Sequence, residues 1–216
     1  MNEAVKAGRR KSEEKAAAIL CAASELFLES GFQGTSIDAV AKRAGVSKQT
    51  VYSHYAGKDD LFRACIRSKV ASYGFAETVV EPHAELRTAL RAMIRRFLDL
   101  LFDPQVIAMH RVVMGESASH PAIAELFYES GPGRTQAAVR RYLEEQVGAG
   151  RLAIPGDRLH YAAVQVLNMA FGEYQLELLM GLIESVDEEE LSVHLDRVVD
   201  DFLRLYGIAR QAGPSA

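Results

Sequence analysis

The chain has 216 residues, of which 49% are hydrophobic and 25% are charged, a composition typical of a globular protein that excludes a disordered or fibrous one. Its two cysteines, Cys21 and Cys65, are too few for a disulfide framework or a thiolate zinc site, so we expect a reducing, cytoplasmic compartment. The longest apolar run near the start, residues 16–23, is too short to cross a membrane, and acidic residues precede it where a signal peptide would be basic. We therefore expect no membrane partner and no export.

The formal net charge of −4 hides an uneven distribution. Up to Lys69, 12 basic residues exceed 8 acidic ones, whereas beyond it 21 acidic residues exceed 13 basic ones. Positive charge displaces the counterions condensed on phosphate, so the distribution favours a nucleic-acid contact by the front of the chain alone. A charged run is more often simply a solvated surface, so this indication is weak by itself.

Helical spacing dominates the chain from residue 16 onward, and strand-like alternation is nearly absent. Proline and glycine residues divide the chain into about nine helical segments. We place the joint between a front module and a larger body near Pro82. We predict an all-α fold, with amphipathic helices over 84–102 and 105–117. A segment over 157–183 is apolar on nearly every side, so it needs a cover on two faces, from its own chain or from another subunit.

The last predicted helix begins near Asp187 and ends at Gly207. Its apolar stripe consists of Leu191, Leu195, Val198, Val199, Phe202 and Tyr206. We interpret the surplus apolar surface of the two C-terminal segments as a four-helix interface with a second copy. The candidate interface residues are Leu167, Leu178, Leu195, Val199 and Phe202.

Residues 34–55 predict a helix, a tight turn and a second helix. Thr35 or Ser36 can cap the first helix, Gly45 supplies the positive φ of the turn, and Ser47 can cap the second helix, whose inward residue is Val51. The residues left for the outside are Lys48, Gln49, Thr50, Tyr52, Ser53 and His54. Hydroxyl and basic groups suit phosphates, while amides and aromatic rings suit base edges, so this set is typical of a helix that reads the major groove. An ordinary helical hairpin is the less favoured alternative.

Residues 27–66 resemble the N-terminal DNA-binding domain of the TetR/AcrR family of bacterial regulators. The resemblance depends on Leu26-Phe27 before Gly31-Phe32, Thr35-Ser36-Ile37, Ala44-Gly45-Val46-Ser47, Thr50-Val51-Tyr52 with Tyr55, and Lys58-Asp59-Asp60-Leu61-Phe62. In the body, residues 127–134 resemble an AefR-like subset of the family.

This resemblance implies a homodimer that places two recognition helices on a double-stranded DNA operator with an inverted repeat, and a helical body that binds a small-molecule effector. It implies four parts, namely a flexible basic arm over 1–12, a helix-turn-helix domain over 13–57, a ligand-binding and dimerisation domain over 58–209, and a disordered tail over 210–216. Arg9, Arg10 and Lys11 in the arm resemble basic residues that some members lay in the minor groove.

By position, Thr50, Tyr52, His54 and Lys58 resemble the family's phosphate contacts, with Thr35 and Ser53 as further candidates, and Lys48 and Gln49 resemble its base contacts. Gln49 departs from the small residue that is frequent in the family, so its amide can contact a base or lie along the backbone.

The body offers a second candidate site, in which adaptable methionines, flat aromatic rings and a few polar groups would hold a largely apolar ligand. The candidates are Met93, Phe97, Met109, His110, Met114, Phe127, Asn168, Phe171 and Tyr174. For each residue taken singly, core packing is the favoured interpretation, because pocket and core share an apolar composition.

Enzymatic signatures are weak. The segment 148–153 contains the glycines of a dinucleotide motif but follows a predicted helix, no serine lies in a nucleophile elbow, and the six histidines lack ligand spacing. We therefore predict no catalytic residue, metal or cofactor. The favoured function is a repressor that leaves a palindromic operator when its ligand binds. An activator or ligand-independent regulator, or less favoured an α-helical enzyme or carrier, remains as the alternative.

Overall fold

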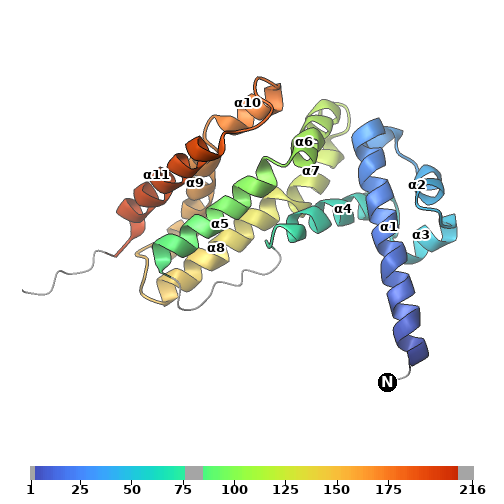
Figure 1. Cartoon of the computed structure of the whole chain (residues 1–216), viewed down its shortest axis with the longest axis horizontal. Coiled ribbons are helices and arrows are strands. Elements are labelled where there is room, and N and C mark those ends of the chain that lie inside the picture. Colours follow the sequence, from blue (N-terminus) through green and yellow to red (C-terminus); the bar gives the residue numbers. More distant parts are fainter. Residues whose placement is uncertain (1–2, 76–84, 209–216) are drawn as a thin grey trace, which may run out of the picture. The chain divides into compact units, whose positions relative to one another are not determined.

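A computed structural model describes residues 3–75 and 85–208, with side chains from residue 9 onward. In these ranges the regular structure is helical apart from a single bridge between Leu152 and Gly207, which confirms the predicted all-α fold (Figure 1). The chain divides into unit 1, Met1–Lys69 with Pro104–Pro132, and unit 2, Val70–Asp103 with Gly133–Ala216. The predicted tail at 210–216 and the joint near Pro82 lie outside the described residues.

Unit 1 contains the DNA-binding motif and two helices from farther along the chain. Its helices are α1 (Glu3–Gly34), α2 (Ile37–Arg43), α3 (Lys48–His54), most of α4 (Lys58–Ser72), α6 (Pro104–Ser117) and α7 (Pro121–Ser130). The centre of its core is a cluster of three phenylalanine rings. Phe62 meets Phe27 and Phe32 edge to face with centroids 5.1 and 5.2 Å away, and Phe27 stacks on Phe32 at 5.8 Å. Edge-to-face and offset stacking are the favoured geometries of aromatic pairs, so this cluster fixes α1 against α4.

The start of α1 differs from the predicted flexible arm over 1–12. The helix includes residues 3–12, and ion pairs one turn apart join Arg9 to Glu13 at 3.0 Å and Arg10 to Glu14 at 3.3 Å. Such pairs stabilise an exposed helix, and the apolar stripe that follows belongs to the same helix. The basic residues therefore belong to a helical segment.

Gly31 breaks α1 three residues before its end, with φ at 72°. A side chain there would be strained by the positive φ, and its Cβ would collide with the carboxylate of Glu116 on α6. That carboxylate also accepts a hydrogen bond from the backbone N–H of Gln33 at 3.2 Å. The missing side chain therefore makes room for a contact between α6 and the end of α1.

Unit 2 contains α5 (Leu86–Leu101), α8 (Pro132–Gly148), a short 3₁₀ turn (Gly156–Arg158), α9 (Leu159–Phe171), α10 (Tyr174–Met180) and α11 (Glu188–Tyr206). The predicted single helix over 157–183 is wrong, because Gly172 ends α9 with φ 49° and ψ −134°, and α10 begins two residues later. Only glycine adopts that conformation readily, and a Cβ at Gly172 would contact the ring of His194.

The predictions for the last helix are confirmed. The Asp187 carboxylate accepts hydrogen bonds from the N–H groups of Glu189 and Glu190 at 2.9 and 3.0 Å, and Gly207 follows the last turn. The predicted stripe is buried against α5 and α9.

Beside this apolar contact, α5 and α11 are joined by four pairs of charged side chains, which we call the ion ladder. Arg87 pairs with Asp200 at 3.0 Å and with Asp196 at 3.1 Å, Arg91 pairs with Asp196 at 3.1 Å, and Arg95 pairs with Glu188 at 2.6 Å.

Candidate nucleic-acid interface

The turn between α2 and α3 has the predicted chemistry. The Ser36 hydroxyl accepts from Ala39 N–H at 3.2 Å, the Ser47 hydroxyl accepts from Thr50 N–H at 3.1 Å, and Gly45 has φ 65°. Val51 is fully buried on the inner face of α3. Because each short helix has a side-chain cap and a buried anchor, the outer face of α3 is held in one orientation.

The outer face of α3 presents Lys48, Gln49, Tyr52 and Ser53 to solvent, with half of the Tyr52 side chain exposed. The ammonium of Lys48 lies 3.0 Å from the Asp38 carboxylate, and this hydrogen bond raises the pKa of Lys48. A duplex phosphate would compete with Asp38 for that ammonium. Gln49 and Tyr52 are thus the residues best placed to contact a base edge and a backbone.

The remaining polar groups of α3 are engaged within the motif. The Thr50 hydroxyl lies 2.9 Å from that of Ser47, and the Ser53 hydroxyl donates to the Thr50 carbonyl at 2.7 Å. His54 is half-buried beside Tyr55, with ring centroids 6.2 Å apart. These three side chains therefore contact neighbouring groups of the motif more than they extend into solvent.

Thr35 and Lys58, two of the candidate DNA contacts, hydrogen-bond carbonyls at the end of α1; Thr35 follows that helix and Lys58 is the first residue of α4. The Thr35 side chain is only 3% exposed and its hydroxyl donates to the Gly31 carbonyl at 2.7 Å. The Lys58 ammonium donates to the Phe32 carbonyl at 2.8 Å and lies 4.5 Å from the centre of the Phe32 ring. Both side chains satisfy carbonyls that a helix end leaves open, so a substitution at either would disturb the fold before any DNA contact.

The nine candidate pocket residues are divided between the two units. Unit 1 holds Met109, His110, Met114 and Phe127, and unit 2 holds Met93, Phe97, Asn168, Phe171 and Tyr174.

In unit 1, the His110 ring meets Phe127 edge to face at 4.9 Å, its Nδ1 lies 2.8 Å from the Val106 carbonyl, and burial lowers its pKa. Met114 is 55% exposed. His110 is therefore a neutral, satisfied core residue at pH 7, whereas Met114 lies on the surface.

In unit 2, Met93 and Phe97 are buried on the inner face of α5, and the Phe97 ring packs against Phe75 at 6.4 Å. Asn168 is exposed, and Phe171 is half-buried. Tyr174 is half-buried between Phe102 and His194, with ring centroids 6.2 and 5.4 Å away. All of these side chains except Asn168 therefore contribute to packing.

The candidate interface residues differ most from expectation, since all five are at most 5% exposed within the single chain. Their apolar stripe is covered by the chain's own helices, so it leaves no surface for a partner. Other apolar side chains of the described C-terminal segments are exposed instead, and these are Tyr161, Leu176, Met180, Leu182, Val193, Leu205 and Ile208. The periodicity identified an apolar stripe correctly but did not show what covers it.

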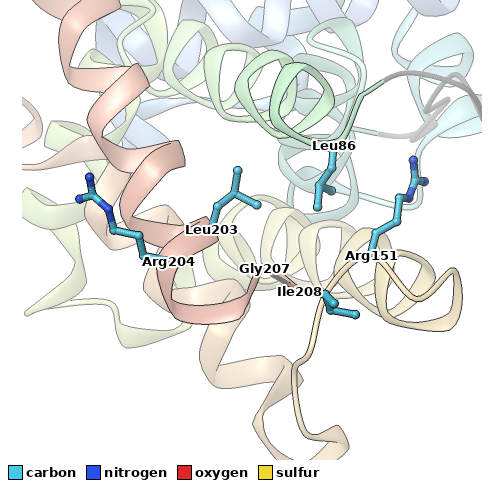
Figure 2. A pocket seen from close by; sticks show the side chains of 6 residues that line it. All are labelled: Leu86, Arg151, Leu203, Arg204, Gly207 and Ile208. Carbon is cyan, nitrogen blue, oxygen red and sulfur yellow. The ribbon is translucent and has the colours of Figure 1, made fainter. Parts of the chain in front are cut away.

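A shallow depression of about 350 Å³ lies on unit 2. It is lined by Leu86, Arg151, Leu203, Arg204, Gly207 and Ile208, none of which was a candidate. In Figure 2 the two arginine side chains lie at opposite edges, with Leu86 and Leu203 between them. No helix in the described ranges is long and apolar enough to span a membrane.

Comparison with known sequences identifies the architecture. Residues 19–65 match the family described as "Bacterial regulatory proteins, tetR family", and residues 88–208, more than half of the chain, match "AefR-like transcriptional repressor, C-terminal domain". The chain belongs to the TetR family. It is therefore a transcriptional regulator with an N-terminal DNA-binding domain.

Several TetR-family proteins illustrate the range of relatives. The chain is 31% identical over 94 residues to the transcriptional activator FasR of Mycolicibacterium smegmatis, a match that covers 43% of each chain. It is 28% identical over 151 residues to the repressor TetR of Mycobacteroides abscessus, covering 68% of this chain and 76% of that protein. The solved structure of the "Flavonoid-responsive Regulator FrrA" has 34% identity and a TM-score of 0.74, and covers 91% of this chain and 98% of its own. The chain thus spans less than half of the length of FasR.

Proposed function

We propose that the protein is a homodimeric repressor that binds a palindromic operator and leaves it when a small, largely apolar molecule binds unit 2. The observation that carries the proposal is the rigidly capped α3, whose exposed Gln49 and Tyr52 are free to meet a duplex, joined to a C-terminal domain that matches AefR-like repressors. A ligand that binds only one of two conformations shifts the population, so it weakens operator binding by its difference in affinity between them.

The exposed apolar side chains of α9 to α11 support the homodimer. Leu176 and Met180 are 62% and 67% exposed, and such side chains gathered on a soluble domain favour burial in an interface. A two-fold dimer spaces its recognition helices by about 34–36 Å or a small multiple, which matches an inverted repeat. We expect Leu176→Glu to sediment as a folded monomer and Leu176→Met to remain dimeric. An unmutated chain that sediments as a monomer would contradict the homodimer.

The name of FrrA supports an apolar, polycyclic effector, since that relative responds to flavonoids. The test is operator affinity with and without the flavonoid naringenin, in the wild type and in Phe171→Ala. We expect naringenin to weaken operator binding by about 1–3 kcal/mol of coupling free energy, and operator DNA to weaken naringenin binding by the same factor. Phe171→Ala, which lies outside unit 1, should keep the ligand-free operator affinity, and loss of the response in this variant would place the effector against the half-buried Phe171 ring. Tight naringenin binding with unchanged operator affinity would contradict release by ligand.

An activator is the second candidate, because FasR is named as one. Deletion of the gene for this protein separates the two cases. Transcripts from its bound promoters should rise if it represses them and fall if it activates them.

A further inference from the structure

The inner face of α8 carries polar groups where the neighbouring core helices carry apolar ones. Thr135, Tyr142 and Gln146 are spaced by seven and four residues, so they share one face of the helix, and they are 3%, 0% and 2% exposed. The buried residues of α5 are all apolar by contrast. The polar character of the α8 face therefore needs an explanation other than core packing.

Two of these polar groups lack a protein partner. The Tyr142 hydroxyl and the Gln146 Oε1 atom have no hydrogen-bond partner among the described residues. Buried polar groups are satisfied in the great majority of cases, because an unsatisfied one loses its hydration without compensation. Burial also raises the pKa of Tyr142 to about 12, so its hydroxyl keeps its proton at pH 7 and is able to donate.

The depression on unit 2 adjoins the same end of α8. The backbone N–H groups of Arg151 and Leu152 donate to the Gln146 carbonyl at 2.9 and 3.3 Å, and Arg151 lines the depression. The Arg151 charge also acts on the Tyr142 hydroxyl. Arg151 therefore links the depression, in which Figure 2 shows Leu86 and Leu203 between two arginines, to the part of α8 that carries Tyr142 and Gln146.

We propose that this depression is the mouth of a ligand site in which Tyr142 and Gln146 hydrogen-bond the hydroxyl group of a neutral aromatic molecule. The proposal rests on the ligand-binding function proposed above and assigns its site. A ligand hydroxyl is the group that fits, because it can donate to Gln146 Oε1 while it accepts from Tyr142. A neutral ligand fits the buried polar side chains of α8, because Thr135, Tyr142 and Gln146 carry no charge at pH 7, while the charged groups of Arg151 and Arg204 belong to the mouth.

The test compares two probes that differ only in the hydroxyl, 2-naphthol and naphthalene, on the full-length protein. Binding is followed by calorimetry or by naphthol fluorescence, which no tryptophan obscures because the chain has none. We expect the wild type to bind 2-naphthol about tenfold more tightly than naphthalene, the ratio that corresponds to a neutral hydrogen bond. In Tyr142→Phe and Gln146→Leu the two probes should bind almost equally. Undiminished preference for 2-naphthol in both variants, or no binding of 2-naphthol to the wild type, would overturn the proposal.

A matched control separates a ligand contact from a structural one. The Tyr206 hydroxyl donates to Gln165 Oε1 at 2.8 Å, so Tyr206→Phe removes a satisfied buried hydrogen bond and should lower Tm by about 2–4 °C. Tyr142→Phe removes a hydroxyl with no protein partner and should leave Tm unchanged or higher. A fall in Tm as large as that of Tyr206→Phe would show that the Tyr142 hydroxyl serves the fold, and would overturn the proposal.

The outcome is distinguishable from failure of the proposed function. If Phe171→Ala loses 2-naphthol while Tyr142→Phe and Gln146→Leu retain it, the ligand site lies elsewhere, which overturns this assignment and leaves ligand-controlled repression intact. If the hydroxyl preference depends on Tyr142 and Gln146 but operator affinity never responds to 2-naphthol, the site stands and release by this ligand fails.

Discussion

Unit 1 and unit 2 hold their helices together by different forces. In unit 1, three phenylalanine rings contact each other in the core, and the Thr35 and Lys58 side chains donate hydrogen bonds to carbonyls at the end of α1. In unit 2, the partly exposed ion ladder joins α5 to α11 beside an apolar stripe. Tyr142 and Gln146 on the buried face of α8 each have a polar side-chain atom without a partner, and unit 1 also has such an atom, the Ser130 hydroxyl. The part that presents residues to DNA is thus built for rigidity, whereas the part proposed to bind a ligand retains interactions that solvent, salt and small molecules can change.

The largest effect is expected from the phenylalanine cluster. Phe62→Ala removes the ring that touches both Phe27 and Phe32, and a large-to-small change in a core costs about 3–5 kcal/mol of unfolding free energy. Urea denaturation measures it. Tyr52→Ala, which removes an exposed ring from the same unit, should cost less than about 0.5 kcal/mol while it weakens operator binding. Equal stability losses for the two variants would refute the assignment of core and surface.

The next largest loss of stability is expected at two glycines with positive φ, Gly31 and Gly45. Gly31→Ala and Gly45→Ala both place a side chain at positive φ, which costs about 1–2 kcal/mol. Only at Gly31 would the new Cβ meet Glu116, whereas Gly45 faces open space. Gly31→Ala should therefore be the more destabilising variant, and Gly31→Ala combined with Glu116→Ala should recover the part of the loss that comes from the collision. A double variant no more stable than Gly31→Ala would show that Glu116 does not limit this position.

The ion ladder should contribute less, and its contribution should depend on salt. Arg91 bonds both Asp196 and Ser192 from α5, so Arg91→Ala should lower Tm by about 2–4 °C at low ionic strength. At about 1 M salt, screening should bring the variant close to the wild type. Phe62→Ala is the control, since its deficit should survive the same salt. A Tm difference for Arg91→Ala that does not change with salt would argue for lost packing rather than lost charge.

Acid should weaken the same ladder. Hydrogen bonds from Arg91 and Arg87 lower the pKa of Asp196, and one from Arg95 lowers that of Glu188. A carboxyl whose pKa is lower in the folded state stabilises the fold above its unfolded pKa, and this contribution is lost as pH falls through the folded pKa. The Tm of the wild type should therefore fall as the pH drops below about 4. Arg91→Ala should lose less of its Tm over the same pH range. Parallel curves for the two proteins would contradict this origin.

The helix-turn-helix motif could be predicted from the sequence because its caps and its turn depend on residues that are close together in the chain. Ser36, Gly45 and Ser47 each act on atoms within three residues, so the caps and the turn appear in the sequence itself. The ion pairs of Arg9 and Arg10 also join residues close together in the chain, and they indicate a helix where we expected a flexible arm.

Contacts between residues far apart in the chain could not be predicted from the sequence. Lys58 reaches a carbonyl 26 residues earlier, and Arg87 pairs with an aspartate 113 residues later, distances over which a sequence pattern indicates no partner. Periodicity located the stripe of α11, but whether its cover is the same chain or a second copy depends on the packing of α5 and α9. Tyr142 and Gln146 were missed because a tyrosine and a glutamine on a helix look unremarkable until burial is known.

We propose that the exposed face of α3 reads DNA and that Gln49 lies at a base edge. The most direct test is to select preferred duplexes from a random pool with the wild type and with Gln49→Ala, at one fixed salt concentration. We predict that the variant loses preference at one symmetric position in each half-site and keeps the rest, because a bidentate amide contributes about 1–3 kcal/mol of discrimination at a single base. Identical preferences from the two proteins would contradict the claim.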